Sequence, residues 1–228
     1  WHAKRLVAAL RAEGAEVVRT SLGRCRFDTG HPGGLAVPGF DDGLPDGVFV
    51  RTIAAGSFEA VTLRLGVLHA LVAAGVPVWN TPRAIETCVD KAQTTWRLAQ
   101  AGLPTPPTWA LESREAATEI VAREAAAGHR VVLKPLFGSQ GKALRLVADP
   151  AELPEPESVA GVYYLQRYVG ADSGWHDHRV FVSAGRVLAA MTRHGATWIT
   201  NIRQGGAAEA WDGGAEAERL AVAAAAAV

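Results

Sequence analysis

The chain has 228 residues, which is enough for one large domain or two smaller ones with real hydrophobic cores. Its 23 basic and 23 acidic residues balance, and this argues against a dominant nucleic-acid-binding surface. Hydrophobic residues make up 49% of a globular composition, yet no apolar run approaches a membrane span and no signal peptide is visible. Cys25 and Cys88 lack metal-type spacing and favour free thiols in a reducing, cytoplasmic compartment.

Helix and strand patterns alternate in the first part of the chain. In order, we expect a helix over 2–12, a strand over 16–20, an irregular stretch over 21–47, a strand over 47–51, a helix over 59–73 and a strand over 76–80. Such alternation is typical of a small parallel α/β sheet.

The remaining elements predict mostly antiparallel strands with flanking helices. They are a helix start at Thr81-Pro82, helices over 90–100, 113–127 and 215–228, strands over 108–111, 130–134, 143–147 and 161–169, and two strands, 179–183 and 186–191, joined by a tight hairpin at Ala184-Gly185. The fold class that follows is α/β, with an α+β second half.

A buried strand that ends in a lysine and continues into a glycine loop occupies Val131–Gly141. Burying Lys134 without an anionic partner is costly, and the loop glycines let backbone N–H groups approach an anion closely. The segment therefore indicates nucleotide phosphates beside Lys134. The alternative is an ordinary turn beside a lysine that extends to solvent. A P-loop is excluded because one glycine spacing is short and Ala143 replaces the magnesium-binding hydroxyl residue.

Two later clusters of polar residues suit the same ligand. Asp177 and Arg179 lie at the start of a strand, and their side chains point to one face. Asp177 could accept hydrogen bonds from hydroxyls and Arg179 could hold an anion. The alternative is that the two residues form a surface ion pair. The Thr200–Gly206 stretch suits a phosphate surface, although an ordinary exposed loop is the preferred interpretation when the stretch is taken alone. His176 and His178 lack an obvious third metal ligand, and no serine-hydrolase or paired-carboxylate pattern is present.

In this order and spacing, these segments resemble the ATP-grasp superfamily and its RimK-like ligases. The motifs that carry the resemblance are Asp90-Lys91, Val131–Gly141, Gln166-Arg167-Tyr168-Val169, Asp177-x-Arg179, Arg193 and Thr200-Asn201-x-x-x-Gly205-Gly206. The subgroup most similar is the tetrahydromethanopterin glutamate ligase type, on its early Trp-His-Ala-Lys-Arg-Leu-like helix and its Thr-Asn-Ile-Arg-Gln-Gly-Gly-like loop. The resemblance implies an ATP-grasp domain over 80–228 and, over 1–79, a pre-ATP-grasp domain, both incomplete at the outer ends.

The resemblance also assigns roles to single residues. Lys91 and Lys134 would contact the ATP phosphates, and Phe137 to Gly141 would close over them. Arg179 and Arg193 would stabilise the transferring phosphate charge, and Asn201 would lie by phosphate and metal. The expected nucleotide-binding set is Lys91, Lys134, Phe137, Gly138, Ser139, Gln140, Gly141, Gln166, Arg167, Tyr168, Val169, Asp177 and Thr200, with the backbone of 167–169 on the adenine and Asp177 towards the ribose or purine.

The implied reaction joins a carboxylate to an amine. ATP would convert the carboxylate into an acyl phosphate, which the amine then attacks, with Mg²⁺ or Mn²⁺ as metal. The family's metal ligands, an Asp and a Glu-x-Asn, are expected beyond Val228, so the chain alone should bind nucleotide without turnover. The expected partners are a small-molecule carboxylate acceptor and an amino acid, with no nucleic acid and no membrane, and a homo-oligomer is left open.

The favoured activity adds glutamate to a pterin or similar acceptor. A protein or peptide glutamate ligase and a lysine-biosynthesis-type ligase remain alternatives, and a non-catalytic ATP-binding domain is the alternative from another class. Acceptor choice is expected near His2, Arg5 and residues 56–59.

Overall fold

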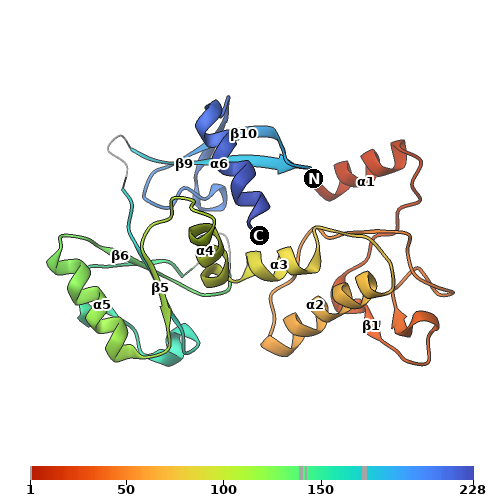
Figure 1. Ribbon diagram of the computed structural model, residues 1–228, viewed down its shortest axis with the longest axis horizontal. Helices are drawn as coiled ribbons and strands as arrows, with labels where there is room; N and C mark the ends of the chain where they lie inside the picture. The colour runs from red at the N-terminus through yellow and green to blue at the C-terminus, as the bar shows by residue number, and fades with distance from the viewer. Residues whose placement is uncertain (1, 139–140, 142, 171–173) are drawn as a thin grey trace. The chain divides into compact units, whose positions relative to one another are not determined.

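The computed structural model describes residues 2–138, 141, 143–170 and 174–228, and the chain divides into two compact units after Glu86 (Figure 1). Both units mix helices with strands, as predicted for an α/β protein. The predicted domain boundary, after residue 79, lies inside the first unit. None of the described helices is long and apolar enough to cross a membrane.

The first unit is built around one long apolar helix. Its elements are α1 (His2–Ala12), η1 (Leu22–Arg24), β1 (Arg26–Phe27), η2 (Pro32–Gly34), β2 (Leu35–Ala36), β3 (Val48–Phe49), α2 (Phe58–Ala73) and β4 (Val78–Trp79), and α3 (Pro82–Val89) crosses the division. Ser57 caps α2, which buries Leu65, Val67, Leu68 and Leu71 in the core of the unit. The predicted parallel sheet is confirmed as the pair β3 and β4, and β1 pairs with β2 in the antiparallel sense.

The strand predicted over 16–20 is wrong. Those residues have no strand assignment, and all but Val17 are exposed. A β-rich stretch becomes a strand only where a neighbouring strand and a packed face receive it, and this one has neither among the described residues.

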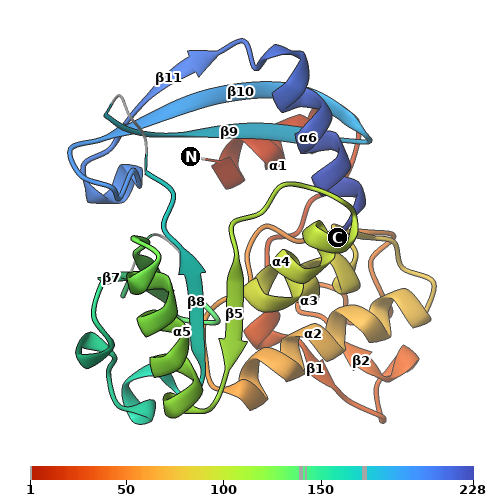
Figure 2. The same ribbon diagram turned by 60° about the vertical axis from the view of Figure 1, so that its left-hand side comes forward.

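The second unit contains two antiparallel sheets, as predicted (Figure 2). Its elements are α4 (Lys91–Gln100), β5 (Thr108–Leu111), α5 (Arg114–Ala126), β6 (Val131–Lys134), β7 (Arg145–Val147), η3 (Pro150–Glu152), η4 (Pro156–Val159), β8 (Tyr163–Arg167), β9 (Trp175–Ser183), β10 (Arg186–Gly195), η5 (Ile202–Gln204), β11 (Ala207–Trp211) and α6 (Gly214–Ala226). One sheet has the order β5-β8-β6-β7 and the other has the order β11-β10-β9. Sequence analysis did not predict β11.

The four-stranded sheet has one apolar face, and the opposite face, which also buries Val132, carries the polar side chains of the site. The apolar face packs with α5 and buries Ala117, Val121, Val131, Leu133, Val147, Leu153, Tyr163 and Leu165. Side chains alternate between faces, so the residues in between point the other way. The register places Lys134 beside Tyr164, and Gln166 beside Thr108, on that second face.

The three-stranded sheet is organised by the β9–β10 hairpin. Ala184 and Gly185 both have positive φ, +48° and +72°, which is the backbone form that joins twisted antiparallel strands in two residues. Both strands are longer than predicted, because their pairing continues to Trp175 opposite Gly195. This extension brings Asp177 directly opposite Arg193.

Candidate functional site

Two lysines of the second unit lie close to the end of β6. The Lys134 ammonium donates to Gln166 Oε1 at 2.5 Å. Lys91, in the first turn of α4, donates from Nζ to the carbonyl oxygens of Pro135 at 2.9 Å, Leu136 at 3.1 Å and Gly138 at 2.9 Å. Lys91 is thus bound to the backbone that follows β6, and Lys134 stands at the strand end just before it.

The charges of these two lysines are poorly compensated. Burial lowers the pKa of both ammonium groups, and the charge of Lys91 lowers the pKa of Lys134 further. Asp90 counteracts this effect at Lys91, but its carboxylate also caps α4 by accepting from the N–H groups of Ala92 and Gln93. No carboxylate of the described residues forms an ion pair with either lysine. A phosphate group would supply the missing negative charge.

A hydrogen-bond network fixes the side chain that receives Lys134. The Gln166 amide donates to Thr108 Oγ1 at 2.9 Å, and this contact directs its oxygen to Lys134. The hydroxyls of Tyr164 and Thr95 hydrogen-bond at 2.8 Å on the same face of the sheet. Sequence reasoning named Gln166 but missed Thr95 and Thr108, whose hydroxyls gain this role only through the register of the strands.

The segment after β8, expected to hold adenine, is fixed on both sides. The N–H of Arg167 donates to Pro107 O and the N–H of Tyr168 donates to Arg130 O, each at 2.8 Å. The Arg167 guanidinium donates to both carboxylate oxygens of Glu124 on α5, at 2.7 and 3.3 Å. Glu124 is only 4% exposed, and the hydrogen bonds from Arg167 lower its pKa against the effect of burial.

Glu124 was not singled out from the sequence, although a signal exists. It follows Ala117 and Val121 at helical spacing on the buried face of α5. An acid on such an apolar stripe requires a cationic partner. Tyr168 and Val169 belong to the same segment: the Arg130 guanidinium lies 4.9 Å from the Tyr168 ring centre, and Val169 is exposed.

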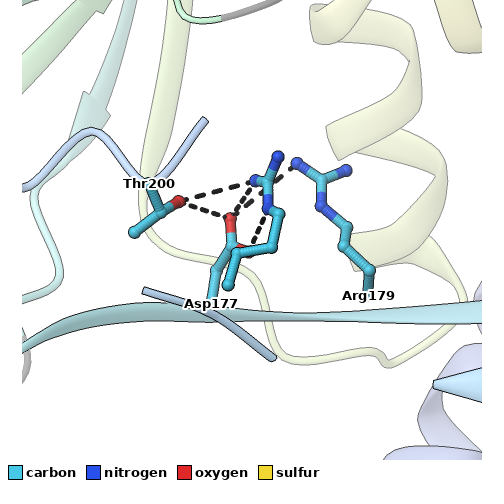
Figure 3. A network of polar contacts seen from close by, with 4 residues as sticks. Asp177, Arg179 and Thr200 are labelled. Atoms are coloured by element: carbon cyan, nitrogen blue, oxygen red, sulfur yellow. Dashed lines mark hydrogen bonds and ion pairs between the residues drawn. The ribbon is translucent and has the colours of Figure 1, made fainter. Parts of the chain in front are cut away.

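Asp177 is the centre of the second group of polar side chains (Figure 3). Arg193 donates from Nε to Asp177 Oδ1 at 2.7 Å and from Nη2 to Oδ2. The Thr200 hydroxyl donates to the same Oδ2 at 2.8 Å, and the Arg179 guanidinium lies 3.8 Å from it. Burial would raise the pKa of Asp177, but the hydrogen bonds from Arg193 and Thr200 outweigh it and lower the pKa.

The two arginines of this group occupy different environments. The Arg193 side chain is 9% exposed and both arms of its guanidinium fork go to Asp177, whereas the Arg179 side chain is 53% exposed. Arg193 therefore holds Asp177 in place, and Arg179 is the arginine that can reach a ligand. The roles given to both residues on the phosphate stay predictions.

Asn201 lies where the loop after β6 meets the loop after β10. Gly141 has a φ of +68°, and a Cβ atom there would fall 2.6 Å from Asn201 Oδ1, so its backbone conformation and this close approach both favour glycine. A Cβ on Gly206 would fall 2.4 Å from the carbonyl oxygen of Thr200. The approach of Gly141 to Asn201 brings the two loops into direct contact. The first loop follows Lys134, and the second contains Thr200, which hydrogen-bonds to Asp177.

Of the residues predicted from Phe137 to Gln140, the structure describes the first two. Phe137 is exposed and Gly138 has a φ of +132°, while Ser139 and Gln140 lie outside the described residues. Within 2–138, 141, 143–170 and 174–228, no group of three His, Cys, Asp or Glu residues could hold a metal ion. His178 instead stacks on Trp211, with ring centres 3.8 Å apart.

Known proteins similar to this chain include ligases. A tetrahydromethanopterin:alpha-L-glutamate ligase of Methanosarcina acetivorans is 35% identical over 181 residues, which cover 72% of this chain and 54% of the relative. The human N-acetylaspartylglutamate synthase A is 32% identical over 155 residues, covering 66% of this chain and 38% of that protein. The chain spans about half the length of the first of these relatives.

A solved structure shows the same fold at lower identity. The ATP-grasp ligase PsnB, complexed with a phosphomimetic variant of its minimal precursor, magnesium and ADP, aligns with a TM-score of 0.69 at 24% identity. The alignment covers 99% of this chain and 78% of PsnB. Residues 88–228 match the family model described as the RimK-like ATP-grasp domain, and the chain belongs to that family.

Proposed function

We propose that the chain binds ATP and belongs to a ligase that joins a carboxylate to the amino group of glutamate. The observation that carries this proposal is the pair Lys91 and Lys134, two ammonium groups with lowered pKa beside the backbone that follows β6. Burying two ammonium groups together costs free energy unless an anion compensates their charge, and a triphosphate supplies several negative oxygens.

The reaction would proceed in two displacements. A carboxylate oxygen attacks the γ-phosphorus of ATP, the bond between that phosphorus and the β,γ-bridging oxygen breaks, and ADP leaves carrying this oxygen. The amine nitrogen then attacks the acyl carbon of the resulting acyl phosphate, inorganic phosphate leaves, and the nitrogen loses a proton. Catalysis of this kind needs placed positive charge and no protein nucleophile.

Each group of side chains would serve one part of that reaction. Lys91 and Lys134 would neutralise phosphate oxygens, and the fixed segment Arg167–Val169 would receive the base. Arg179 would meet the charge on the transferring phosphoryl group, since its guanidinium is exposed. Arg193 would keep the Asp177 carboxylate oriented.

Glutamate as the amine is supported by the relatives, whose names state glutamate ligation for the methanogen enzyme and N-acetylaspartylglutamate synthesis for the human one. A pterin or a small dicarboxylate is accordingly the acceptor that we expect. A divalent cation, Mg²⁺ or Mn²⁺, would neutralise phosphate charge, and PsnB was solved with magnesium and ADP. We assign it no ligand within the described residues.

The variant Lys134→Met tests nucleotide binding, with calorimetric titration of ATP as the measurement. Loss of one charge-assisted contact should weaken ATP binding by about 10- to 100-fold while the chain stays folded. Lys4→Met, on α1 of the other unit, is the matched control and should leave affinity unchanged. Equal ATP affinity for Lys134→Met and the unmodified chain would contradict the proposal.

Ligase activity requires a second measurement. ADP release should depend on both glutamate and a carboxylate acceptor in a protein carrying the whole encoded chain. If ATP binds tightly and ADP release depends on neither, a non-catalytic ATP-binding domain is the correct assignment.

A further inference from the structure

The first unit contains an open cleft that none of the site residues described above lines. Its volume is about 710 Å³, within the range of small-molecule sites. The lining residues are Arg24, Arg26, His31, Ala36, Val37, Pro38, Gly39 and Asp41. Sequence analysis placed acceptor choice near His2, Arg5 and residues 56–59, and none of these lines the cleft.

Part of the cleft lining is apolar, formed by Ala36, Val37 and Pro38 beside a tight turn. Ala36 and Val37 are buried, and the N–H of Phe40 donates to Val37 O at 3.0 Å to close a turn through Pro38 and Gly39. Gly39 has a φ of +91°, and a Cβ there would fall 2.6 Å from Val18 Cγ1. The turn therefore needs glycine, and it presents a fixed apolar wall.

The rim carries positive charge that is only partly compensated. Arg26, opposite Ala36 in the β1–β2 pair, donates from Nε and Nη2 to one oxygen of Asp28, at 3.3 and 3.1 Å. The other oxygen of Asp28 accepts from the N–H of Gly30 at 3.2 Å, and Arg26 is the guanidinium that pairs with this carboxylate. The Arg24 backbone N–H donates to Ser21 O at 2.9 Å, but the Arg24 guanidinium forms no hydrogen bond or ion pair with any residue that the structure describes.

We propose that this cleft binds the carboxylate acceptor of the ligase, with a carboxylate on Arg24 and Arg26 and an apolar stem on Ala36, Val37 and Pro38. This inference rests on the proposed function, which requires an acceptor carboxylate. Guanidinium groups match the planar, two-oxygen geometry of that ligand, and the apolar part of the lining accommodates the carbon chain between two carboxylates. Asp41 also lines the cleft, and its negative charge would repel a carboxylate placed close to it.

The test follows the Ala36 and Val37 methyl NMR signals of this chain during titration with glutarate and with N-acetylaspartate. Both dicarboxylates should shift these signals to saturation. Arg24→Gln should weaken binding about tenfold, as expected for one charge-assisted contact near solvent. Asp41→Asn should tighten binding about two- to threefold, because it removes a like charge. Arg51→Gln, an exposed arginine outside the lining, is the matched control and should change nothing.

Three outcomes would overturn the inference: no saturable shift with either dicarboxylate, equal affinity in Arg24→Gln, or displacement of glutarate by an equal concentration of inorganic phosphate, which would mark a general anion site. Titration of ATP into the same samples separates this failure from failure of the proposed function. If ATP binds and the dicarboxylates do not, only the acceptor assignment falls. If ATP does not bind, the proposed function falls.

Discussion

Asp177 and Arg193 illustrate how one residue pair can matter for stability and for the site at once. Arg193 is 9% exposed and has Asp177 as its carboxylate partner, so removing the negative charge leaves a nearly buried cation. We expect Asp177→Asn to lower the free energy of unfolding by about 2 kcal/mol, measured by urea denaturation, because water partly screens the 36%-exposed Asp177 side chain. Glu209→Gln, which removes an exposed partner of His194 on the adjacent strand, should change it by less than about 0.5 kcal/mol. Equal losses in both variants would contradict this difference.

The same pair makes the free energy of unfolding depend on pH, and the sign of this dependence follows from the lowered pKa of Asp177. In the unfolded chain an aspartate titrates near pH 3.9, and in the folded chain Asp177 titrates below that value. The unfolded state therefore binds the proton first, so the stabilisation is present above about pH 4 and is lost as the pH falls through the folded pKa. Urea denaturation from pH 7 down to pH 3 should show the gap between the native chain and Asp177→Asn narrowing at the acid end. A constant gap would show that Asp177 acts through packing alone.

The sequence pattern named the residues of the candidate site, whose roles stay predictions, but not their contacts. Lys134, Asp177 and Arg179 stood out because charged groups at strand ends next to glycine loops are unusual. That Arg193 lies on Asp177 could not be predicted, because it depends on a strand register that extends past the predicted ends of the hairpin. Thr108 was missed for the same reason, since its partner Gln166 is 58 residues away along the chain. Glu124 shows a signal of its own, an acid on an apolar helix stripe, but its partner Arg167, 43 residues away, could not be named.

Among the elements, capped helices were predictable and weakly patterned strands were not. Asp90 caps α4 and Ser113 caps α5, and both helices begin close to their predicted starts, because capping is a local interaction between neighbouring residues. The stretch Ala207–Trp211 is rich in alanine, which favours helix, yet it forms β11 because β10 offers a paired edge. The residues 16–20 show the opposite case, where strand-forming residues find no partner.

Helix α5 holds Arg167, part of the segment proposed to receive adenine, through one buried acid. Glu124 accepts from two nitrogens of Arg167, so Glu124→Gln should weaken this contact and lower the free energy of unfolding by about 2 kcal/mol, since Arg167 is partly solvated. ATP affinity should fall as well, because the segment 167–168 loses one of its anchors. Urea denaturation and calorimetric titration of ATP measure the two effects.

The control for this variant lies on the same helix. Glu119 is exposed on α5, and Glu119→Gln should alter neither stability nor ATP affinity beyond about 0.5 kcal/mol. Loss of stability in Glu124→Gln with unchanged ATP affinity would show that the ion pair serves folding alone. The positioning role of Glu124 would then be wrong.

On the scale of the whole molecule, each unit has a hydrophobic core of its own. One core contains Leu68, and the other contains Leu165, and both side chains are fully buried. A unit with its own hydrophobic core unfolds cooperatively, so a chain with two such units should show two calorimetric transitions. Leu68→Ala should destabilise one of them and Leu165→Ala the other, each by about 2–5 kcal/mol.

ATP distinguishes the two transitions, because its proposed contacts, Lys91, Lys134 and Arg179, all belong to the second unit. A ligand that binds only the folded form raises the transition of the unit that holds it, by about 2.7 kcal/mol at a hundredfold excess over the dissociation constant. We therefore expect ATP to shift the transition that Leu165→Ala lowers and to leave the transition that Leu68→Ala lowers in place. Glutarate, acting at the cleft of the first unit, should do the reverse. If either ligand moves both transitions together, or either variant lowers both, the two units unfold as one cooperative block and the assignment of one ligand to each is not supported.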